Sequence, residues 1–236
     1  MTATIAPVQL AGGGMRHELR AVKVVWYRDI LRFRTDRGRI ISSFVQPLLF
    51  LFVLGDGLGA SLPSGAFGVD YSTFLFPGVL ATSVMFTAVF SAISIVWDRE
   101  LGFLREMLVA PVSRTSIVLG KALGGATVAT AQSVVLLALA GLVGVPYAPL
   151  MLIGSLVLLF IIAFTLTALG LVIAVRVDQI QTVMPRVQLL LAPLMFLSGA
   201  FFPVSSALPV WLDVVIVTGV GGLLLAVAAW LFSRPE

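Results

Sequence analysis

The chain has 236 residues, of which 59% are hydrophobic and 11% are charged, with a formal net charge of +4 and a mean hydropathy of +1.10. Soluble domains are about half apolar and about a quarter charged, so this composition excludes an ordinary soluble protein and favours a bilayer. The apolar runs are continuous rather than alternating, which excludes a membrane β-barrel. Cysteine is absent, which excludes disulfides and thiolate metal sites. The predicted fold class is all-α, a polytopic membrane protein.

The N-terminal region carries most of the positive charge. We expect residues 1–15 to be disordered, because they are small and weakly apolar and precede the positive charge, which is the wrong order for a secretory signal. Residues 16–39 hold eight of the fifteen Lys and Arg residues. Five apolar residues at helical spacing share one face of this stretch: Leu19, Val22, Trp26, Ile30 and Phe33. The pattern predicts an amphipathic interfacial helix with its arginines toward anionic lipid or a partner. A solvated basic arm that only sets topology is the alternative, and a nucleic-acid arm is disfavoured.

Residues 40–236 are predicted to form a single transmembrane domain with six helical spans, each about 20 residues or slightly shorter or longer. Gln46 and Pro47 interrupt the first span, and we expect the amide of Gln46 to find a polar partner inside the bundle. Gly120 and Gly124 in the third span have the spacing of close helix packing. The six predicted spans are residues 40–60, 71–96, 116–143, 150–175, 187–202 and 214–232.

The positive charges predict the orientation of the spans. The loops at 61–70, 145–149 and 203–213 contain no Lys or Arg, so all fifteen cationic residues fall on the other side. By the positive-inside rule, both termini are cytoplasmic, in a plasma membrane that is most simply bacterial. The cationic residues beyond the N-terminal arm are Arg99, Arg105, Arg114, Lys121, Arg176, Arg186 and Arg234.

Residues 97–121 form a dense polar island between the second and third spans. An apolar stripe at helical spacing consists of Trp97, Leu101, Leu104 and Leu108. The opposite face is polar, and it comprises Asp98, Arg99, Gly102, Arg105 and Glu106. The pattern predicts an amphipathic cytoplasmic helix that ends before Pro111. Its mixed-charge face suits docking to a polar protein surface, and periodicity alone supports a solvated loop helix equally well.

Several motifs resemble one family. Four motifs are similar to those of type-2 ABC exporter permeases, especially the permeases of daunorubicin resistance and nodulation export. They are residues 98–108 (DRELGFLREML), 110–114 (APVSR), 119–121 (LGK) and 196–204 (FLSGAFFPV). The similarity spans most of residues 16–211. It implies that the basic N-terminal helix is a connecting helix and that the island is a coupling helix docked on a separate ATPase subunit. It also implies two permease protomers, identical or different, with substrate passing between them. The residues that it assigns to ATPase coupling are Asp98, Arg99, Glu100, Gly102, Arg105, Glu106 and Arg114.

The chain departs from the family pattern after Trp211. Family members continue with a stretch resembling Asn-Pro-Leu-Thr-Tyr and a further short extracellular helix before the last span. Here Trp211, Leu212 and Asp213 lead straight into Val214. The resemblance therefore implies a chain shortened before its last helix.

No enzyme or cofactor site is predicted in this chain. The phosphate-loop pattern would need glycine where Thr115 stands and Ser or Thr where Ala122 stands. ATP and Mg are expected on the partner ATPase. The lone His17, the lack of metal-ligand clusters and the lack of a Ser/His/Asp set disfavour metal binding and intramembrane catalysis. Lys121 is expected to snorkel to the lipid headgroups.

The predicted function is the permease subunit of an ABC exporter for a hydrophobic or amphipathic substrate, such as a drug, a lipid or a glycolipid-like molecule. An ion-coupled transporter or channel without an ATPase is one alternative, but it would need membrane-buried acids, and only Asp56 approaches that depth. A non-transporting assembly subunit is another, favoured by the shortened segment. Candidate residues of the substrate pathway are Phe44, Gln46, Phe86, Gln188, Phe196 and Phe201.

Overall fold

The computed structural model describes residues 14–59, 70–102, 113–145, 148–177, 179–197 and 209–233, and in these residues it contains helices and no strands. The prediction of an all-α polytopic membrane protein is confirmed. Five helices are long and apolar enough to cross a membrane, and they are Arg37–Leu54, Tyr71–Glu100, Arg114–Ala138, Pro149–Val175 and Trp211–Ser233. The predicted span at 187–202 overlaps α8 (Ile180–Leu197), which is not one of these five. A count of six spans therefore stays a prediction.

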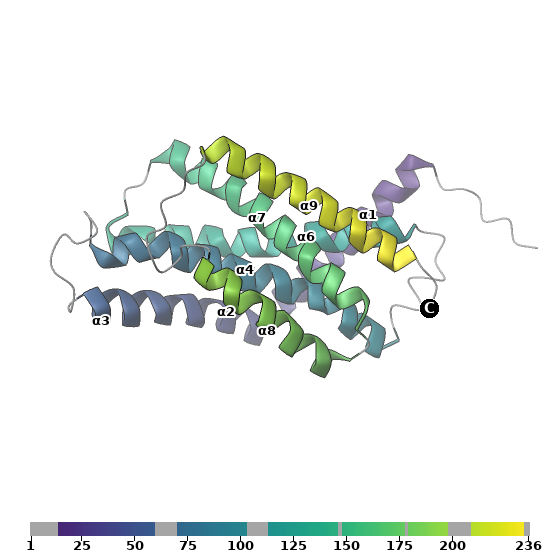
Figure 1. The fold of residues 1–236 in the computed structure, drawn as a ribbon, viewed down its shortest axis with the longest axis horizontal. Coiled ribbons are helices and arrows are strands. Elements are labelled where there is room, and N and C mark those ends of the chain that lie inside the picture. The colour runs from purple at the N-terminus through teal and green to yellow at the C-terminus, as the bar shows by residue number, and fades with distance from the viewer. Residues whose placement is uncertain are drawn as a thin grey trace, which may run out of the picture.

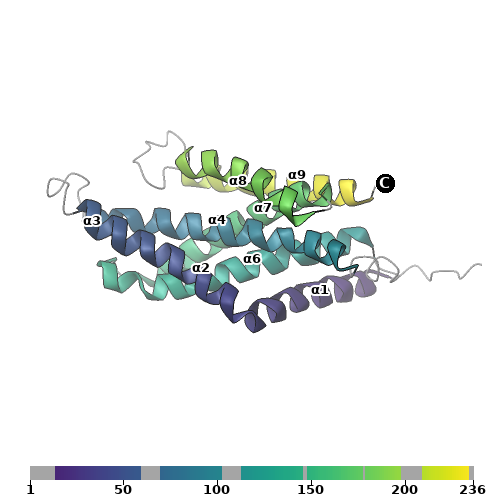
Figure 2. The same ribbon diagram turned by 90° about the horizontal axis from the view of Figure 1, so that it is seen from below.

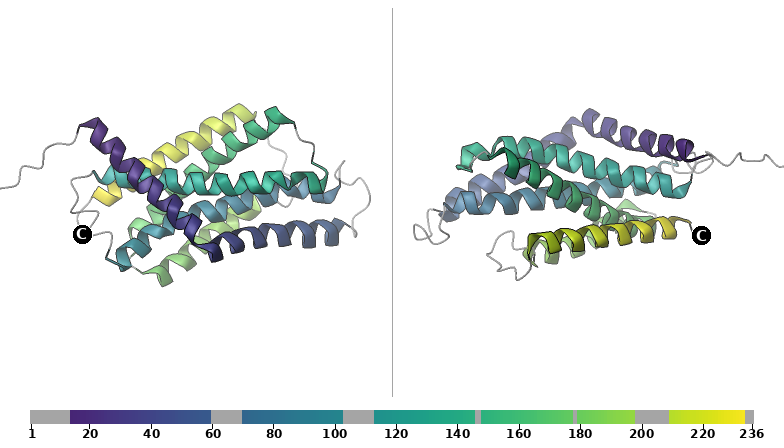
Figure 3. Two further views of the ribbon diagram at one scale, coloured as in Figure 1. Left: turned by 180° about the vertical axis from the view of Figure 1, so that it is seen from behind. Right: turned by 90° about the horizontal axis from the view of Figure 1, so that it is seen from above.

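An elbow joins the basic N-terminal helix to the first span. α1 (Met15–Thr35) and α2 (Arg37–Leu49) meet at Asp36, which has a non-helical backbone. The Asp36 carboxylate accepts a hydrogen bond of 3.0 Å from the backbone N–H of Arg39 and so caps α2. The predicted helix over 16–39 is therefore divided, because residues 37–39 already belong to the first span. Figure 3 shows α1 running obliquely across the helices behind it and turning at this elbow.

Pro47 alters the backbone of the first span without ending it. A π-helical turn (Phe50–Leu54) and a short helix α3 (Gly55–Gly59) follow α2. Proline has no N–H to donate, and one turn later the N–H of Phe50 donates to the carbonyls of both Gln46 and Pro47. Such widened turns are rare, occur mostly as single turns inside α-helices and are frequent at functional sites.

Three helices form the centre of the bundle, and α2, α8 and α9 lie outside them (Figures 1 and 2). Close contacts at glycines hold the central helices together. A Cβ atom on Gly125 would lie 2.6 Å from Thr167, and one on Gly170 would lie 2.7 Å from Ala92, as expected of small residues between membrane helices. The central helices are α4 (Tyr71–Glu100), α6 (Arg114–Ala138) and α7 (Pro149–Val175). A 3₁₀ turn (Ala140–Val143) follows α6, and the last helix, α9, is Val210–Ser233.

The predicted glycine pair of the third span packs against the N-terminal helix. A Cβ atom on Gly120 would lie 2.7 Å from Cβ of Val25, and one on Gly124 would lie 3.0 Å from Cβ of Asp29. The two glycines therefore let α1 approach α6 closely. Close packing at this pair occurs as predicted, but its partner is the basic arm rather than another of the apolar spans.

Candidate functional site

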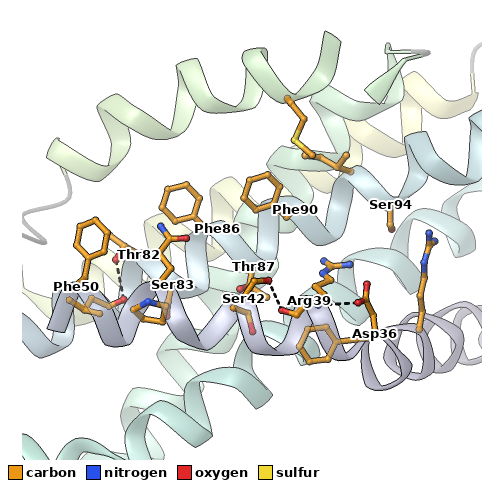
Figure 4. Close-up of a pocket in the computed structure, with 18 of the residues that line it drawn as sticks. Asp36, Arg39, Ser42, Phe50, Thr82, Ser83, Phe86, Thr87, Phe90 and Ser94 are labelled. Carbon is orange, nitrogen blue, oxygen red and sulfur yellow. Dashed lines mark hydrogen bonds between the residues drawn. The ribbon is translucent and has the colours of Figure 1, made fainter. Parts of the chain in front are cut away.

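A pocket of about 550 Å³ opens between α2, α4 and α8, beside the elbow of α1 and α2 (Figure 4). Its volume lies within the usual range of small-molecule sites, about 300–1,000 Å³. Hydroxyl groups line it at Ser42, Ser43, Thr82, Ser83, Thr87 and Ser94, and aromatic rings line it at Phe33, Phe50, Phe86, Phe90 and Trp97. This combination of apolar surface and scattered hydroxyls suits an amphipathic molecule.

The structure brings only part of the predicted substrate pathway to this pocket. Gln46 and Phe86 line it, whereas Phe44 packs against the core on another side of α2. Gln188 on α8 is exposed and does not line the pocket. Phe196 belongs to α8, but its side chain is outside the described part of the chain, and Phe201 lies outside the described residues altogether.

Sequence reasoning missed a row of pocket residues along α4. They recur every three or four positions, which places them on one face of the helix. A search for helical spacing of hydroxyl and aromatic residues, instead of aromatic and amide groups alone, would have found them. This row comprises Ser83, Thr87, Phe90, Ser94 and Trp97.

A buried side-chain amide links two of the helices that line the pocket. The amide nitrogen of Gln132 on α6 donates to the carbonyl of Ser43 on α2 at 2.8 Å. The hydroxyl of Thr87 on α4 donates to the amide oxygen of Gln132 at 2.5 Å. Because both polar ends of the buried amide have partners, it joins three helices without an unsatisfied group.

A cluster of charged side chains lies beside the pocket, where α1, α4 and α6 meet. Nζ of Lys121 lies 2.8 Å from Asp98 and 3.6 Å from Asp29. Nη2 of Arg28 lies 2.8 Å from Asp98 and 3.4 Å from Asp29, and Nη1 of Arg32 lies 3.2 Å from Asp98. Lys121 also donates to the hydroxyl of Ser94 at 3.0 Å, which connects the cluster to the pocket.

Two predictions about this region are wrong. Lys121 does not snorkel to headgroups, because α1 covers α6 and only 1% of the lysine is exposed. Asp98 does not lie on a solvent-facing polar surface, since it is 4% exposed and paired with three cations. Two acids, Asp29 and Asp98, are buried inside the protein, while the expectation that Asp56 approaches membrane depth stays a prediction.

The predicted coupling helix does not begin at Trp97. The last turns of α4 continue to Glu100, and the helix ends at Leu101 and Gly102, where Gly102 has a φ of +74°, a conformation that favours glycine. The predicted segment is therefore divided at Gly102. Its remaining part, residues 103–112 with Arg105 and Glu106, lies outside the described residues.

The three other predicted coupling residues contact this chain's own backbone. Arg99 donates to the carbonyls of Val175 at 2.8 Å and Val177 at 3.2 Å, where α7 ends. The carboxylate of Glu100 accepts from the N–H of Ile180 at 2.9 Å, where α8 begins.

On the other side of residues 103–112, Arg114 donates to the carbonyl of Phe232 at 2.8 Å, near the end of α9. Cationic side chains commonly satisfy the last carbonyls of a helix in this way. Together with Arg99 and Glu100, this contact ties both ends of residues 103–112 to other helices.

The beginning of α1 is also attached to the beginning of α6. The carboxylate of Glu18 accepts hydrogen bonds of 2.5 Å from the hydroxyls of Ser113 and Ser116. These bonds hold the pKa of Glu18 below its ordinary value, because they stabilise the ionised carboxylate. The basic arm is thus joined to the bundle by ion pairs, by glycine contacts and by this carboxylate.

Known proteins resemble most of this chain. Residues 20–217 match the family described as ABC-2 type transporter. The chain is 31% identical over 189 residues to Nodulation protein J of Rhizobium leguminosarum bv. viciae, covering 79% of this chain and 72% of the relative. Identity is 33% over 191 residues to Nodulation protein J of Rhizobium leguminosarum bv. trifolii, covering 77% and 70%. The Putative transport permease ycf38 of Cyanophora paradoxa is 28% identical over 180 residues, covering 75% and 61%. The predicted resemblance is confirmed: this multi-pass membrane protein belongs to the ABC-2 type transporter family.

Proposed function

We propose that the chain is the permease subunit of an ABC exporter, which moves a hydrophobic or amphipathic substrate outward while a separate ATPase subunit hydrolyses ATP with Mg. Family membership supports a transporter subunit, and the name of the ycf38 relative is that of a transport permease. The single observation that carries the proposal is the open pocket, which is lined on one side by α8. The first residue of α8 is hydrogen-bonded to Glu100, near the beginning of the predicted coupling segment.

The attachments suggest how motion would reach the pocket. If residues 103–112 dock on an ATPase, their displacement would pull on Arg99 and Glu100, which hold the connection between α7 and α8. Met184 and Met195 of α8 line the pocket, so a shift of α8 would change its width. In this proposal Arg99, Glu100 and Arg114 transmit the motion, and the docking itself falls to residues 103–112, with Arg105 and Glu106 among them.

The proposed assembly is a pair of permease protomers with two ATPases in a bacterial plasma membrane, with both termini in the cytoplasm. The outer helices expose large apolar side chains, including Leu189 on α8 at 79% and Leu223 on α9 at 65%. Such surfaces suit contact with lipid or with a second protomer. A homodimer is the simplest arrangement, and a heterodimer would use the same surfaces.

Co-expression with an ATPase encoded in a neighbouring reading frame tests the proposal. We expect the two chains to purify together and inside-out vesicles to accumulate an amphipathic dye, such as Hoechst 33342, only with ATP. The variant Arg99→Gln with Glu100→Gln should keep the ATPase bound but reduce uptake at least five-fold, because the two hydrogen-bonding attachments to α7 and α8 are weakened. Arg20→Gln, on the exposed part of α1, is the matched control and should transport normally. Failure of any neighbouring ATPase to associate would refute the proposal.

Cysteine labelling tests the proposed orientation, because the natural chain has no cysteine. Ser64→Cys, in the loop at 61–70, should react with an impermeant maleimide added outside cells, and Arg20→Cys should react only after permeabilisation. The opposite pattern would refute the cytoplasmic placement of the termini.

An ion-coupled transporter is the second candidate, and the burial of Asp29 and Asp98 favours it. However, both carboxylates lie within ion-pair distance of cations, which suits a fixed connection between helices better than an ion pathway. Uptake that persists without ATP and collapses with a protonophore would establish this alternative. A subunit without transport activity would associate with the ATPase yet show neither kind of uptake.

A further inference from the structure

The charges of the pocket are confined to one end. Three charged residues, Arg32, Asp36 and Arg39, line the end at the elbow of α1 and α2, and the remaining lining residues are uncharged. Figure 4 shows Asp36 and Arg39 at this end, with Phe86 and Phe90 farther along. A site with one charged end and an apolar body matches a molecule with a charged head group and an apolar tail.

Two of the three charges are already engaged. Nη1 of Arg32 lies 3.2 Å from Asp98, and the Asp36 carboxylate caps the N-terminus of α2. Arg39 differs from both. Its guanidinium lies 5.9 Å from the ring centroid of Phe33, and no carboxylate of the described residues forms an ion pair with it. Arg39 is therefore the cation available to a ligand.

The surroundings add positive charge to this end. In the neighbouring cluster, three cations, Arg28, Arg32 and Lys121, face two carboxylates, Asp29 and Asp98. One positive charge is in excess there, and Arg39 balances Asp36. A guanidinium recognises carboxylate or phosphate oxygens with paired hydrogen bonds. The net charge of this end thus favours an anion over a cation.

The length of the pocket limits the tail. The lining of the first span runs from Arg39 on α2 to Phe50 at the start of the π-helical turn, and eleven residue steps rise about 16 Å in a helix. Phe50, Phe86 and Phe90 line the body beyond the charged end. We propose that this pocket binds a single-chain amphiphile whose anionic head group, a carboxylate or a phosphate monoester, pairs with Arg39. This inference rests on the proposed function in treating the pocket as the substrate site, and it specifies the class of substrate.

Photo-crosslinking to the full-length protein in nanodiscs of neutral phosphatidylcholine tests the proposal. The probe is a palmitic acid analogue with a diazirine near the end of its tail, compared with its methyl ester and with the corresponding primary amine. We expect the acid to label α4 and α8 at the pocket at least five-fold more than the ester or the amine. Excess unlabelled dodecyl phosphate should compete, and inorganic phosphate should not, because the head group alone lacks the apolar contact.

Variants of the arginine complete the test. Arg39→Gln should lower labelling by the acid to the level of the ester, and Arg39→Lys should keep an intermediate level because it keeps the charge. Arg37→Gln is the matched control, since Arg37 is an exposed arginine of the same turn that does not line the pocket. Equal labelling by acid and ester in the natural protein, a preference for the amine, or unchanged labelling of a folded Arg39→Gln variant would each overturn the proposal.

The binding experiment is independent of the transport experiment. Labelling needs neither ATP nor a partner subunit. Selective labelling by the acid without any ATP-dependent uptake would refute the proposed exporter and leave the anionic site standing. ATP-dependent uptake of a dye without selective labelling would support the exporter and refute the anionic site.

Discussion

The ion-pair cluster and the pocket lie side by side but differ in the exposure and the packing of their side chains. In the cluster, Lys121 and Asp98 are 1% and 4% exposed, and glycines bring α1 against α6. In the pocket, polar and aromatic side chains surround a volume of about 550 Å³ that is open at the protein surface. Arg32 belongs to both, and Ser94 connects them, since its hydroxyl accepts from Lys121 and it lines the pocket.

This difference indicates which parts of the molecule are fixed and which are free to move. Most of the apolar length of α4 is buried, whereas only 11% of the residues in the apolar lengths of the first span and of α9 are buried. Closely packed regions with paired polar groups resist local opening, and sparsely contacted elements open at lower free energy. The central helices α4, α6 and α7, with α1 packed against α6, are therefore expected to move as a unit, while α2 and α8 adjust the width of the pocket.

The largest expected effect comes from removing the central carboxylate of the cluster. Asp98→Leu removes the nearer partner of the buried Lys121 and leaves it only Asp29, at 3.6 Å, and breaking a buried pair costs about 3–5 kcal/mol. Adding Lys121→Met should recover at least half of the loss, because a well-packed apolar pair replaces the charges. Thermal unfolding of the purified protein in detergent, monitored by size-exclusion chromatography, measures the loss in the single variant and the recovery in the double variant. A double variant as unstable as the single one would contradict the central role of this pair.

A smaller loss should follow from filling the contact between α1 and α6. Gly120→Ala places a methyl group 2.7 Å from Cβ of Val25, and such overpacking costs about 1–3 kcal/mol. Gly154→Ala is the matched control, because nothing lies within 4 Å of its Cβ position. The control should be neutral or stabilising by up to about 1 kcal/mol. Thermal unfolding distinguishes the two, and equal melting temperatures would show that α1 is not tightly held.

Filling the pocket should leave stability unchanged and remove function. Ser42→Trp adds a large side chain to the pocket lining, and its effect on unfolding should stay within about 0.5 kcal/mol, as for other surface changes. ATP-dependent uptake of the dye should fall several-fold. Ile41→Trp, at an adjacent position that is 62% exposed and does not line the pocket, should transport normally. Equal uptake by the two variants would place the substrate elsewhere.

The smallest effect concerns pH at the beginning of α1. Because the folded protein lowers the pKa of Glu18, the hydrogen bonds to Ser113 and Ser116 stabilise the protein fully above the unfolded pKa of roughly 4.3. This contribution is lost as the pH falls through the lower folded value. Glu18→Gln should therefore melt slightly lower than the natural protein at pH 7, and the difference should shrink below about pH 4. A difference that is independent of pH would contradict the role of the ionised carboxylate.

The pattern of neighbouring residues in the sequence was sufficient to predict the helices. It was not sufficient to predict the direction in which their charged side chains point. The apolar lengths of the spans, the irregularity at Pro47 and the close packing at Gly120 were all readable from neighbouring residues. The division of residues 97–108 into an apolar stripe and a polar face was misleading, because it assumed that charged side chains face solvent. The partners of Asp98 are Arg28, Arg32 and Lys121, which lie on two other helices, and no periodicity within residues 97–108 could reveal them.

By itself, the sequence determined that this protein is a helical, multi-pass membrane protein, because hydropathy adds up along each stretch of chain independently of the others. Its motifs also determined the family. Only the tertiary structure decided that Lys121 is buried instead of reaching the headgroups. It also decided that Arg99 holds the end of α7 and Glu100 the start of α8, and that Arg39 stands at one end of an open pocket. These features depend on which helices meet, and a buried charge is tolerated only where another helix brings its counter-charge within a few ångströms.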